Sequence, residues 1–227
     1  MTLSSPLQDI RSFYDRFDAP ITALDCGANC APHNSTGKPF CCDICQAVPV
    51  AYQQEWDYLK NRTDLWHEWR GNECSSDPGS HEELRAGTPE HLLLLACKGP
   101  AFCLREFRTS SCRQFPFFPY ITSNYRFIGL AYYWEFEPTC WALSNLGMVT
   151  DAYRKAFISI YDELFNFRFD EFESYAAISE EMRAHFLSHK RRFPVLHRNG
   201  GIYMVSIASE SLRKTTAERL PHLGIYS

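Results

Sequence analysis

Five cysteines lie within twenty residues near the start of this 227-residue chain, in the motifs Cys-Gly-Ala-Asn-Cys (26–30) and Cys-Cys-Asp-Ile-Cys (41–45). A second group of cysteines lies between residues 97 and 140, and Cys74 stands apart in a polar segment. Thiols at this density can form disulfides, bind a metal or carry out redox chemistry. The remaining sequence helps to decide among these three possibilities.

Metal ligation is the chemistry that this pattern favours. Four thiolates form a tetrahedral site for zinc, and four can equally hold an iron–sulfur cluster. A close pair such as Cys42 and Cys45 supplies two ligands from one turn, and the second group would join a remote segment to them. Spacing does not distinguish zinc from iron–sulfur. The predicted ligands are Cys26, Cys30, Cys41, Cys42, Cys45, Cys97, Cys103, Cys112 and Cys140.

Disulfides are the main alternative for these cysteines. The first twenty residues mix Asp and Arg with single apolar residues, so they are not typical of a signal peptide. The longest apolar run, at 92–97, is too short to span a bilayer. We therefore expect a cytoplasmic protein without a membrane partner. Thiols stay reduced in the cytosol, which favours metal ligation, and Cys74 is expected to be a free thiol.

Composition gives little indication of a partner. The net charge is −4 and 45% of the residues are hydrophobic, which is enough for a substantial core. Basic residues are too few between positions 115 and 136 for the aromatic side chains there to indicate nucleic-acid binding. We expect those aromatic residues to form a sheet core. A protein partner or protein substrate remains open.

The hydrophobic pattern predicts helices and strands around a long irregular segment. Helices are predicted at 5–18, 52–70, 151–167 and 174–190. Two strands are predicted within 117–136, turning near Ser123-Asn124, and a hairpin at 195–205 turns at Asn199-Gly200. The segment from 18 to 46 lacks a helical period and is expected to be a loop that lets thiolates converge.

Together these elements predict an α+β fold. Its core is expected to be irregular, cysteine-rich and centred on a metal, with a small antiparallel sheet and flanking helices. We expect a metal-binding domain at 1–155, including the N-terminal helix, and a helical extension at 156–227 packed on it.

The order of the motifs resembles the YkgJ-type cysteine-cluster family, which is described as a zinc- or iron-chelating domain. The resemblance covers about residues 24–155. Its early pattern is two spaced cysteines, a Cys-Cys pair and, after an apolar stretch, a glutamate, here Glu55. Its later pattern includes an arginine and Cys-Arg-x-Phe-Pro. The matching residues are Cys26, Cys30, Cys41, Cys42, Glu55, Cys97, Cys103, Arg108, Cys112, Arg113, Phe115, Pro116 and Cys140.

This sequence departs from the family pattern at two places. Ten residues separate Cys30 from the Cys-Cys pair, where the family usually has very few, and Thr109 stands where the family has proline. The first departure leaves open which of Cys41, Cys42 and Cys45 are ligands. The resemblance implies metal binding and does not specify a reaction.

Several residues beside the cysteines could support a metal centre. Arg113 and Arg108 could donate hydrogen bonds to the sulfur atoms or form ordinary surface ion pairs. Glu55 could orient a ligand or carry a proton, or be an ordinary helical carboxylate. His33 is expected to be a solvated loop residue. His185 and His189, four residues apart on a helix, are expected to lie on a solvated face.

Two functions follow from these expectations. The first is a binding protein that chelates iron, as an iron–sulfur cluster, or Zn²⁺ through clustered cysteines. The alternative is an iron–sulfur enzyme with redox or protein-modifying chemistry, as in relatives similar to flagellin lysine methylase. A closed four-thiolate site has no position for substrate, whereas a catalytic site keeps one open. The sequence leaves the question of enzymatic activity open.

Overall fold

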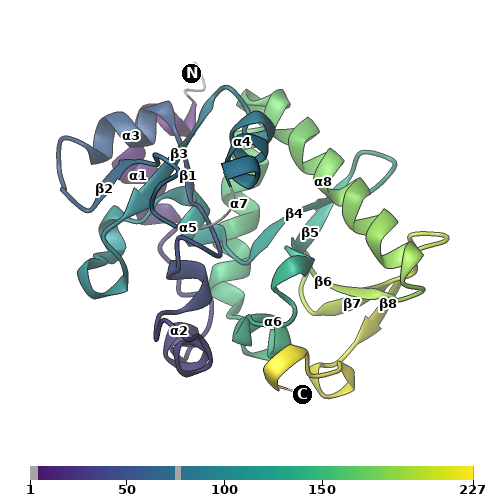
Figure 1. Cartoon of the computed structure of the whole chain (residues 1–227). Coiled ribbons are helices and arrows are strands. Elements are labelled where there is room, and N and C mark those ends of the chain that lie inside the picture. The colour runs from purple at the N-terminus through teal and green to yellow at the C-terminus, as the bar shows by residue number, and fades with distance from the viewer. Residues whose placement is uncertain (1–4, 75–77, 227) are drawn as a thin grey trace. The chain divides into compact units, whose positions relative to one another are not determined.

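The computed structural model describes residues 5–74 and 78–226, which form two compact units (Figure 1). The first unit comprises the described residues up to Asp18 and Gly27–Phe115, and the second comprises Ala19–Cys26 and the described residues from Pro116 onward. The boundary predicted near residue 155 falls inside helix α7 (Asp151–Phe167). The structure therefore divides the chain differently from the sequence-based prediction.

The first unit contains a three-stranded antiparallel sheet in the order β1-β3-β2. Its strands are β1 (Val50–Tyr52), β2 (Trp66–Glu68) and β3 (Leu92–Cys97). Trp66 lies opposite Cys97 in the ladder. The pairing therefore holds Cys97, at the end of the central strand, beside β2.

The two helices predicted in the first unit are shorter than expected. Helix α1 (Ile10–Arg16) begins late because the Asp9 side chain caps it by accepting from the backbone N–H of Ser12 at 3.0 Å. Helix α3 (Gln53–Leu59) ends well before residue 70, so the second half of that prediction is wrong. The aromatic residues there follow a helical spacing, but backbone pairing with β3 makes this segment a strand. Two further helices were not predicted: α4 (Pro78–Gly87) and α5 (Ser110–Gln114).

The segment predicted as a long loop consists of short turns. It contains the five-residue helix α2 (Cys26–Cys30) and 3₁₀ turns at Ala31–His33 and Phe40–Cys42. The N-terminal residue of α2, Cys26, belongs to the second unit, and the rest of α2 belongs to the first. This irregular path agrees with the absence of a hydrophobic period in the sequence.

The second unit contains a five-stranded antiparallel sheet in the order β4-β5-β6-β7-β8. Both predicted hairpins are present, and the last strand of the sheet was not predicted. The segment after residue 155 is therefore not only helical, since it supplies three strands of this sheet. The strands are β4 (Phe117–Ile121), β5 (Phe127–Tyr132), β6 (Phe193–His197), β7 (Ile202–Val205) and β8 (Leu212–Thr215). At the level of an α+β fold with small antiparallel sheets, the prediction is confirmed.

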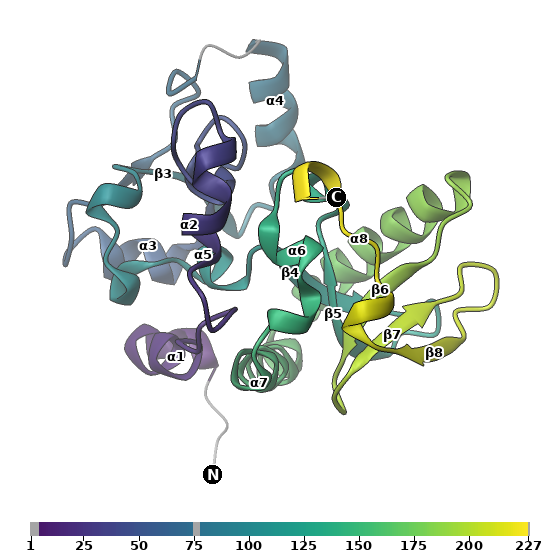
Figure 2. The ribbon, with the colours of Figure 1, turned by 90° about the horizontal axis from the view of Figure 1, so that it is seen from below.

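Helix α8 (Phe169–Ser188) packs on the edge strand β4, and both belong to the second unit, which Figures 1 and 2 show from two sides. The Ser179 hydroxyl accepts from the N–H of Ile121 at 3.0 Å, and Arg183 donates to the Ile121 carbonyl at 2.8 Å. Pro119 lacks an N–H and is tolerated because β4 is an edge strand. Side chains of α8 thus satisfy backbone groups that an open edge would expose.

Gly129 lies in β5 opposite His197 of β6. Its φ is +154°, and a Cβ added there would lie 2.2 Å from the carbonyl oxygen of Leu196. We expect Gly129→Ala to lower the free energy of unfolding by about 2–4 kcal/mol, because the added methyl forces the two strands apart. Urea unfolding followed by circular dichroism measures this loss. Gly87→Ala is the matched control, since nothing lies within 4 Å of the position a Cβ would take there.

Glu210 lies in the turn before β8 and interacts with donors from three other segments of the second unit. It accepts from the Tyr120 hydroxyl at 3.0 Å and from the Ser123 N–H at 3.0 Å, and it pairs with Arg183 at 3.2 Å. Burial acts to raise the pKa of this carboxyl, but the hydrogen bonds from Ser123 and the charge of Arg183 outweigh it. The net pKa lies below its ordinary value.

The lowered pKa of Glu210 gives a stability difference that depends on pH. A carboxyl with a depressed pKa stabilises the folded state above its unfolded pKa, which is about 4.3, and loses that contribution as the pH falls through the folded pKa. We expect Glu210→Gln to cost about 1–2 kcal/mol at pH 7 and to converge with the parent below about pH 4. Denaturant unfolding at several pH values measures the difference. A cost that stays constant from pH 7 to pH 3 would show that ionisation of Glu210 does not stabilise the fold.

Candidate metal centre

The short helix α5 carries Cys112 and is anchored by most of its other side chains. The Thr109 hydroxyl caps the helix by accepting from the N–H of Cys112 at 3.3 Å. The Ser111 hydroxyl donates to the carbonyl of Val50 at 2.6 Å and accepts from the N–H of Val50 at 3.2 Å. These bonds join α5 to β1, so the backbone position of Cys112 is fixed by its neighbours on both sides.

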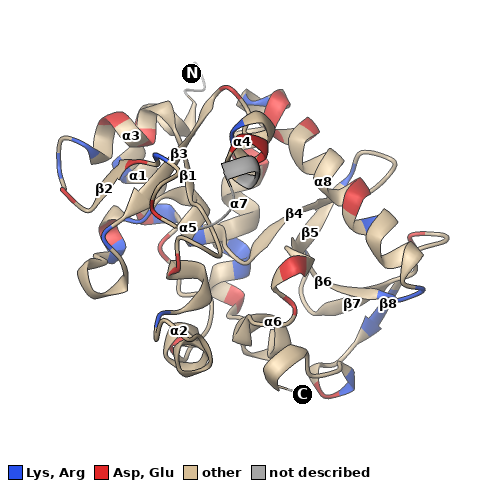
Figure 3. Cartoon of the chain, in the orientation of Figure 1, with Lys and Arg blue, Asp and Glu red and all other residues tan. Residues whose placement is uncertain are grey.

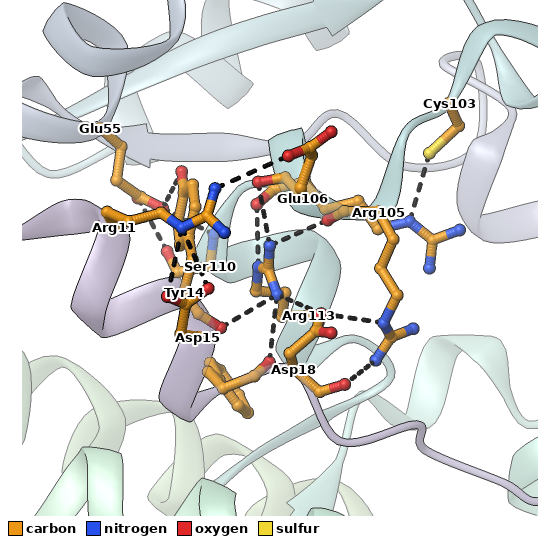
Figure 4. A network of polar contacts seen from close by, with 12 residues as sticks. Arg11, Tyr14, Asp15, Asp18, Glu55, Cys103, Arg105, Glu106, Ser110 and Arg113 are labelled. Carbon is orange, nitrogen blue, oxygen red and sulfur yellow. Dashed lines mark hydrogen bonds and ion pairs between the residues drawn. The ribbon is translucent and has the colours of Figure 1, made fainter.

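Glu55 holds α5 from the other side. Its side chain is 0% exposed and accepts four hydrogen bonds. The donors are the Tyr14 hydroxyl (2.9 Å), the Tyr52 N–H (3.0 Å), the Ser110 N–H (2.7 Å) and the Ser110 hydroxyl (2.8 Å), and Figure 4 shows Glu55 directed toward Tyr14 and Ser110. Burial raises the pKa of Glu55, while the four donors oppose that rise. Through these hydrogen bonds Glu55 links α1, α3 and α5, and its role toward a ligand or a proton stays a prediction.

Arg113 is buried, and neither sequence-based alternative for it describes its contacts. Its guanidinium lies 4.4 Å from the centroid of the Tyr14 ring and pairs with Asp18 at 2.8 Å. It does not point to a sulfur atom or to the surface; it organises the backbone before α5 and the end of α1 (Figure 4). The carbonyl groups that accept from it belong to Tyr14, Phe17, Arg105, Glu106 and Arg108.

Arg108 is the arginine that contacts a sulfur atom. Its Nε donates to the Sγ of Cys103 at 3.2 Å. Burial acts to lower the pKa of Arg108, but the hydrogen bond to Cys103 and the nearby thiol groups of Cys103, Cys112 and Cys42 raise it overall. One guanidinium therefore lies within electrostatic reach of three cysteines from two separate segments.

Strand pairing links Cys97 to the segment that carries Arg108. Its partner in the ladder, Trp66, donates its indole N–H to the carbonyl of Phe107 at 2.7 Å. Phe107 immediately precedes Arg108. The end of β3 and the segment that carries Arg108 are thus joined through a single tryptophan.

Electrostatic interactions link four cysteines of the first unit that lie outside the disulfide. Burial is the main cause that raises the pKa of Cys112 to about 12, and the charges of Cys42 and Cys97 raise it further. Burial likewise raises the pKa of Cys97, with additional contributions from Cys42 and Cys103. Such mutual effects place these thiols within electrostatic reach of one another. The four are Cys42, Cys97, Cys103 and Cys112.

A network of hydrogen bonds to Asp43 fixes the loop that carries the pair Cys41-Cys42. The Sγ atoms of Cys41 and Cys42 lie 3.9 Å apart. The Asp43 carboxylate accepts from Asn34 Nδ2 at 3.0 Å and from the Thr36 hydroxyl at 2.9 Å. Although Asp43 is buried, its pKa is lowered by these donors and by the N–H of Cys45. The loop that carries Cys41 and Cys42 is therefore fixed by polar contacts of its own.

Cys45 and Cys74 differ from the sequence-based expectation. They form a disulfide with a Cα–Cα distance of 5.5 Å across a sequence separation of 29 residues. Cys45 was predicted to be a metal ligand and Cys74 a free thiol, and in this structure neither has a free thiol. Sequence spacing gave no indication of this pairing, because the two positions approach only through the path of β1, α3 and β2.

The other predicted ligands lie outside the group of four. Cys30 is buried in α2 and directs its thiol to the carbonyl of Gly27 at 3.6 Å. Cys26 and Cys140 belong to the second unit, where Cys140 directly precedes helix α6 (Trp141–Ser144). His33 ends a 3₁₀ turn between the two cysteine motifs. The predictions that Cys26, Cys30 and Cys140 are ligands remain predictions.

His185 and His189 are packed against each other at the end of α8, with ring centroids 4.3 Å apart. His185 is half-buried and stacks on Trp134, with ring centroids 5.4 Å apart. The prediction that both histidines are solvated therefore holds only for His189, which is exposed. His189 Nδ1 lies 2.8 Å from the carbonyl oxygen of His185. This contact orients the ring from within its own helix.

The fit of a metal to these cysteines rests on the chemistry of the donors. In residues 5–74 and 78–226, no three His, Cys, Asp or Glu side chains are arranged closely enough to hold a metal ion. The four coupled thiols are nevertheless a donor set that soft metals such as zinc and iron prefer, with a cation beside one of them. The residues fit such a metal by type, and binding would require the sulfur atoms to move closer together.

Some residues of the site could not be identified from the sequence. Tyr14 and Asp18 lie about 95 residues before Arg113, and no motif links them to it. The run Thr109-Ser110-Ser111 does carry a usable signal, because Thr and Ser are common at helix N-termini. That signal would have predicted α5 and the fixed position of Cys112.

Charges of both signs occur in the second unit. Figure 3 shows basic residues on β8, where Arg213 and Lys214 lie, and acidic residues in the first turn of α8. Within the part of the chain that the structure describes, no helix has both the length and the apolar character needed to cross a membrane.

No protein-family model matches the chain, and no curated protein or solved structure is similar enough to match it. Function is therefore inferred from the side chains themselves.

Proposed function

We propose that the chain is a metal-binding protein that chelates iron, as an iron–sulfur cluster, or zinc through Cys42, Cys97, Cys103 and Cys112. The observation that carries the proposal is that the Arg108 guanidinium interacts with three of these cysteines, Cys42, Cys103 and Cys112, and donates to Cys103 at 3.2 Å. The resemblance to the YkgJ-type family supports the same assignment. Bound metal would stabilise thiolates that burial otherwise keeps protonated.

The first-unit scaffold has a separate role in this proposal. Glu55, Ser111 and Arg113 fix the backbone around Cys112, and Trp66 fixes the end of β3 beside the Arg108 segment. Ligands held by a preorganised backbone lose less entropy when they bind a metal. A centre assembled from the 41–42 turn, β3 and α5 would also link remote parts of the first unit.

The experiment that tests the proposed function is anaerobic purification of the full chain followed by metal analysis and an optical spectrum. We expect stoichiometric metal. A brown protein with iron and acid-labile sulfide identifies an iron–sulfur cluster, and a colourless protein with zinc identifies a zinc site. A folded protein that contains no metal and takes up neither zinc nor iron with sulfide would contradict the proposal.

We expect Arg108 to strengthen metal binding by the centre. Its Nε–Sγ contact compensates thiolate charge, so Arg108→Gln is expected to weaken metal binding by about tenfold, as outer-shell partners typically do. Competition with a coloured chelator measures the affinity. Arg105→Gln is the matched control, because Arg105 pairs with Asp18 rather than with a sulfur atom. Equal affinities for the parent and Arg108→Gln would show that the contact does not act on the metal centre.

A further inference from the structure

The two edges of the five-stranded sheet in the second unit differ in what covers them. Side chains of α8 bond to backbone groups of the edge strand β4. At the opposite edge, no strand in the part of the chain that the structure describes pairs with the outer side of β8. Leu212, Arg213 and Lys214 of β8 are all exposed. Strand β8 is therefore the open edge of this sheet.

The register of β7 and β8 determines which backbone groups point outward. The N–H of Ser206 donates to the carbonyl of Ser211 at 3.0 Å, and this pair continues the β7–β8 ladder. Hydrogen-bonded and non-hydrogen-bonded pairs alternate along an antiparallel ladder. Since Ser211 bonds to β7, the next residue does not. The N–H and C=O groups of Leu212 and Lys214 therefore point away from the sheet.

The charge of β8 indicates the kind of strand that could pair with it. Arg213 and Lys214 are neighbours in β8 (Figure 3), and neither forms an ion pair within residues 5–74 and 78–226. Glu210, just before the strand, pairs with Arg183 instead. Opposite charges on paired strands stabilise the pairing, and like charges weaken it. Two β8 edges would bring cations against cations, so an acidic strand is the complementary partner.

We propose that the outer edge of β8 binds an extended acidic segment of a protein partner, which joins the sheet as an additional strand. The N–H and C=O groups of Leu212 and Lys214 form the main-chain hydrogen bonds, and carboxylates of the segment pair with Arg213 and Lys214. This inference concerns the second unit alone and does not depend on metal binding by the first.

The test uses the full chain, isotope-labelled for NMR, and a synthetic peptide that alternates glutamate and valine. A peptide that alternates lysine and valine is the control. Each is added up to about 1 mM, the weak end of specific affinities. We expect the glutamate peptide to shift the amide signals of Leu212 and Lys214 and to slow their exchange with solvent. High salt should weaken this binding, because it screens exposed charges.

Two pairs of variants separate backbone pairing from charge. Leu212→Pro removes an outward N–H, which an edge strand tolerates. We expect it to weaken peptide binding by about 3- to 10-fold relative to Leu212→Ala, which keeps that N–H. Lys214→Glu should weaken binding by about tenfold. Lys155→Glu, the same change of charge at an exposed position of α7, should leave it unchanged. Circular dichroism confirms that each variant is folded.

Three outcomes would overturn the inference. The first is that the glutamate peptide leaves the amide signals of Leu212 and Lys214 unchanged, or that both peptides bind equally. The second is equal peptide affinity in Leu212→Pro and Leu212→Ala. The third is self-association of the parent that Leu212→Pro abolishes, which would identify β8 as an interface between copies of the chain. Each of these outcomes would leave the proposed metal centre unaffected.

Discussion

Cys112→Ser is expected to weaken metal binding by more than about 100-fold, because a serine hydroxyl is a poor ligand for a soft metal and the helix that carries Cys112 is held by the bonds of Ser110 and Ser111. Desolvation raises the pKa of the Cys112 thiol to about 12, so without metal this group is a neutral thiol that serine replaces at little electrostatic cost. The folded state should therefore survive the substitution in the metal-free protein. Chelator competition measures the affinity, and circular dichroism measures the folded fraction.

Cys30→Ser is the matched control for this substitution. Cys30 is also a cysteine of the first unit outside the disulfide, but its thiol is directed to the carbonyl of Gly27 in its own helix. We expect it to retain the parent's metal content. Equal metal content in the parent and Cys112→Ser would remove Cys112 from the centre, and loss of metal in Cys30→Ser would show that the centre extends beyond the four coupled thiols.

Glu55→Ala is expected to cause the largest loss of stability in the first unit. The substitution leaves four buried donors without an acceptor, on Tyr14, Tyr52 and Ser110. Each unsatisfied buried donor costs about 1–3 kcal/mol, partly offset where water enters, so we expect a total of about 3–5 kcal/mol. Denaturant unfolding of the metal-free chain measures this loss directly. Metal affinity should fall as well, because Ser110 then no longer fixes α5.

Glu55→Gln separates hydrogen bonding from charge. Glutamine keeps one carbonyl oxygen and replaces the other acceptor with an amide donor, so some of the four bonds survive. The free energy of unfolding of Glu55→Gln should therefore lie between those of the parent and Glu55→Ala. If Glu55→Ala unfolds at the same denaturant concentration as the parent, the carboxylate does not hold these elements together.

The elements that could be predicted from the sequence are those whose signals are local. Helix α7 was predicted with its observed bounds because apolar residues recur at helical spacing from Tyr153 to Leu164. The β6–β7 hairpin was predicted from Asn199-Gly200, which suits a tight turn. In both cases the information needed lies within about twenty residues.

The errors occur where a distant segment determines the local structure. Trp66 and Trp69 have helical spacing, but Trp66 pairs with Cys97, thirty-one positions later, and becomes part of a strand. β8 is short and has largely exposed side chains, so it lacks the apolar pattern of a strand and is recognisable only from its pairing with β7. Pairing of this kind cannot be seen in a single window of sequence.

In the candidate site, too, distant segments determine what each residue contacts. The cysteines and the arginines could be identified from their spacing, but their roles depend on how the chain folds around them. Arg113, next to Cys112, is turned toward carbonyl groups, whereas Arg108, five residues before Arg113, reaches the sulfur of Cys103. The pairing of Cys45 with Cys74 likewise depends on the path of the residues between them.

X-ray absorption at the metal edge of the loaded, full-length protein tests the central claim most directly. We predict a shell of sulfur ligands at about 2.3 Å with no dominant nitrogen or oxygen shell, for zinc and for an iron–sulfur cluster alike. That shell should lose intensity or disappear in Cys112→Ser. A shell dominated by nitrogen or oxygen, or a sulfur shell unchanged in Cys112→Ser, would contradict a centre built from these four cysteines.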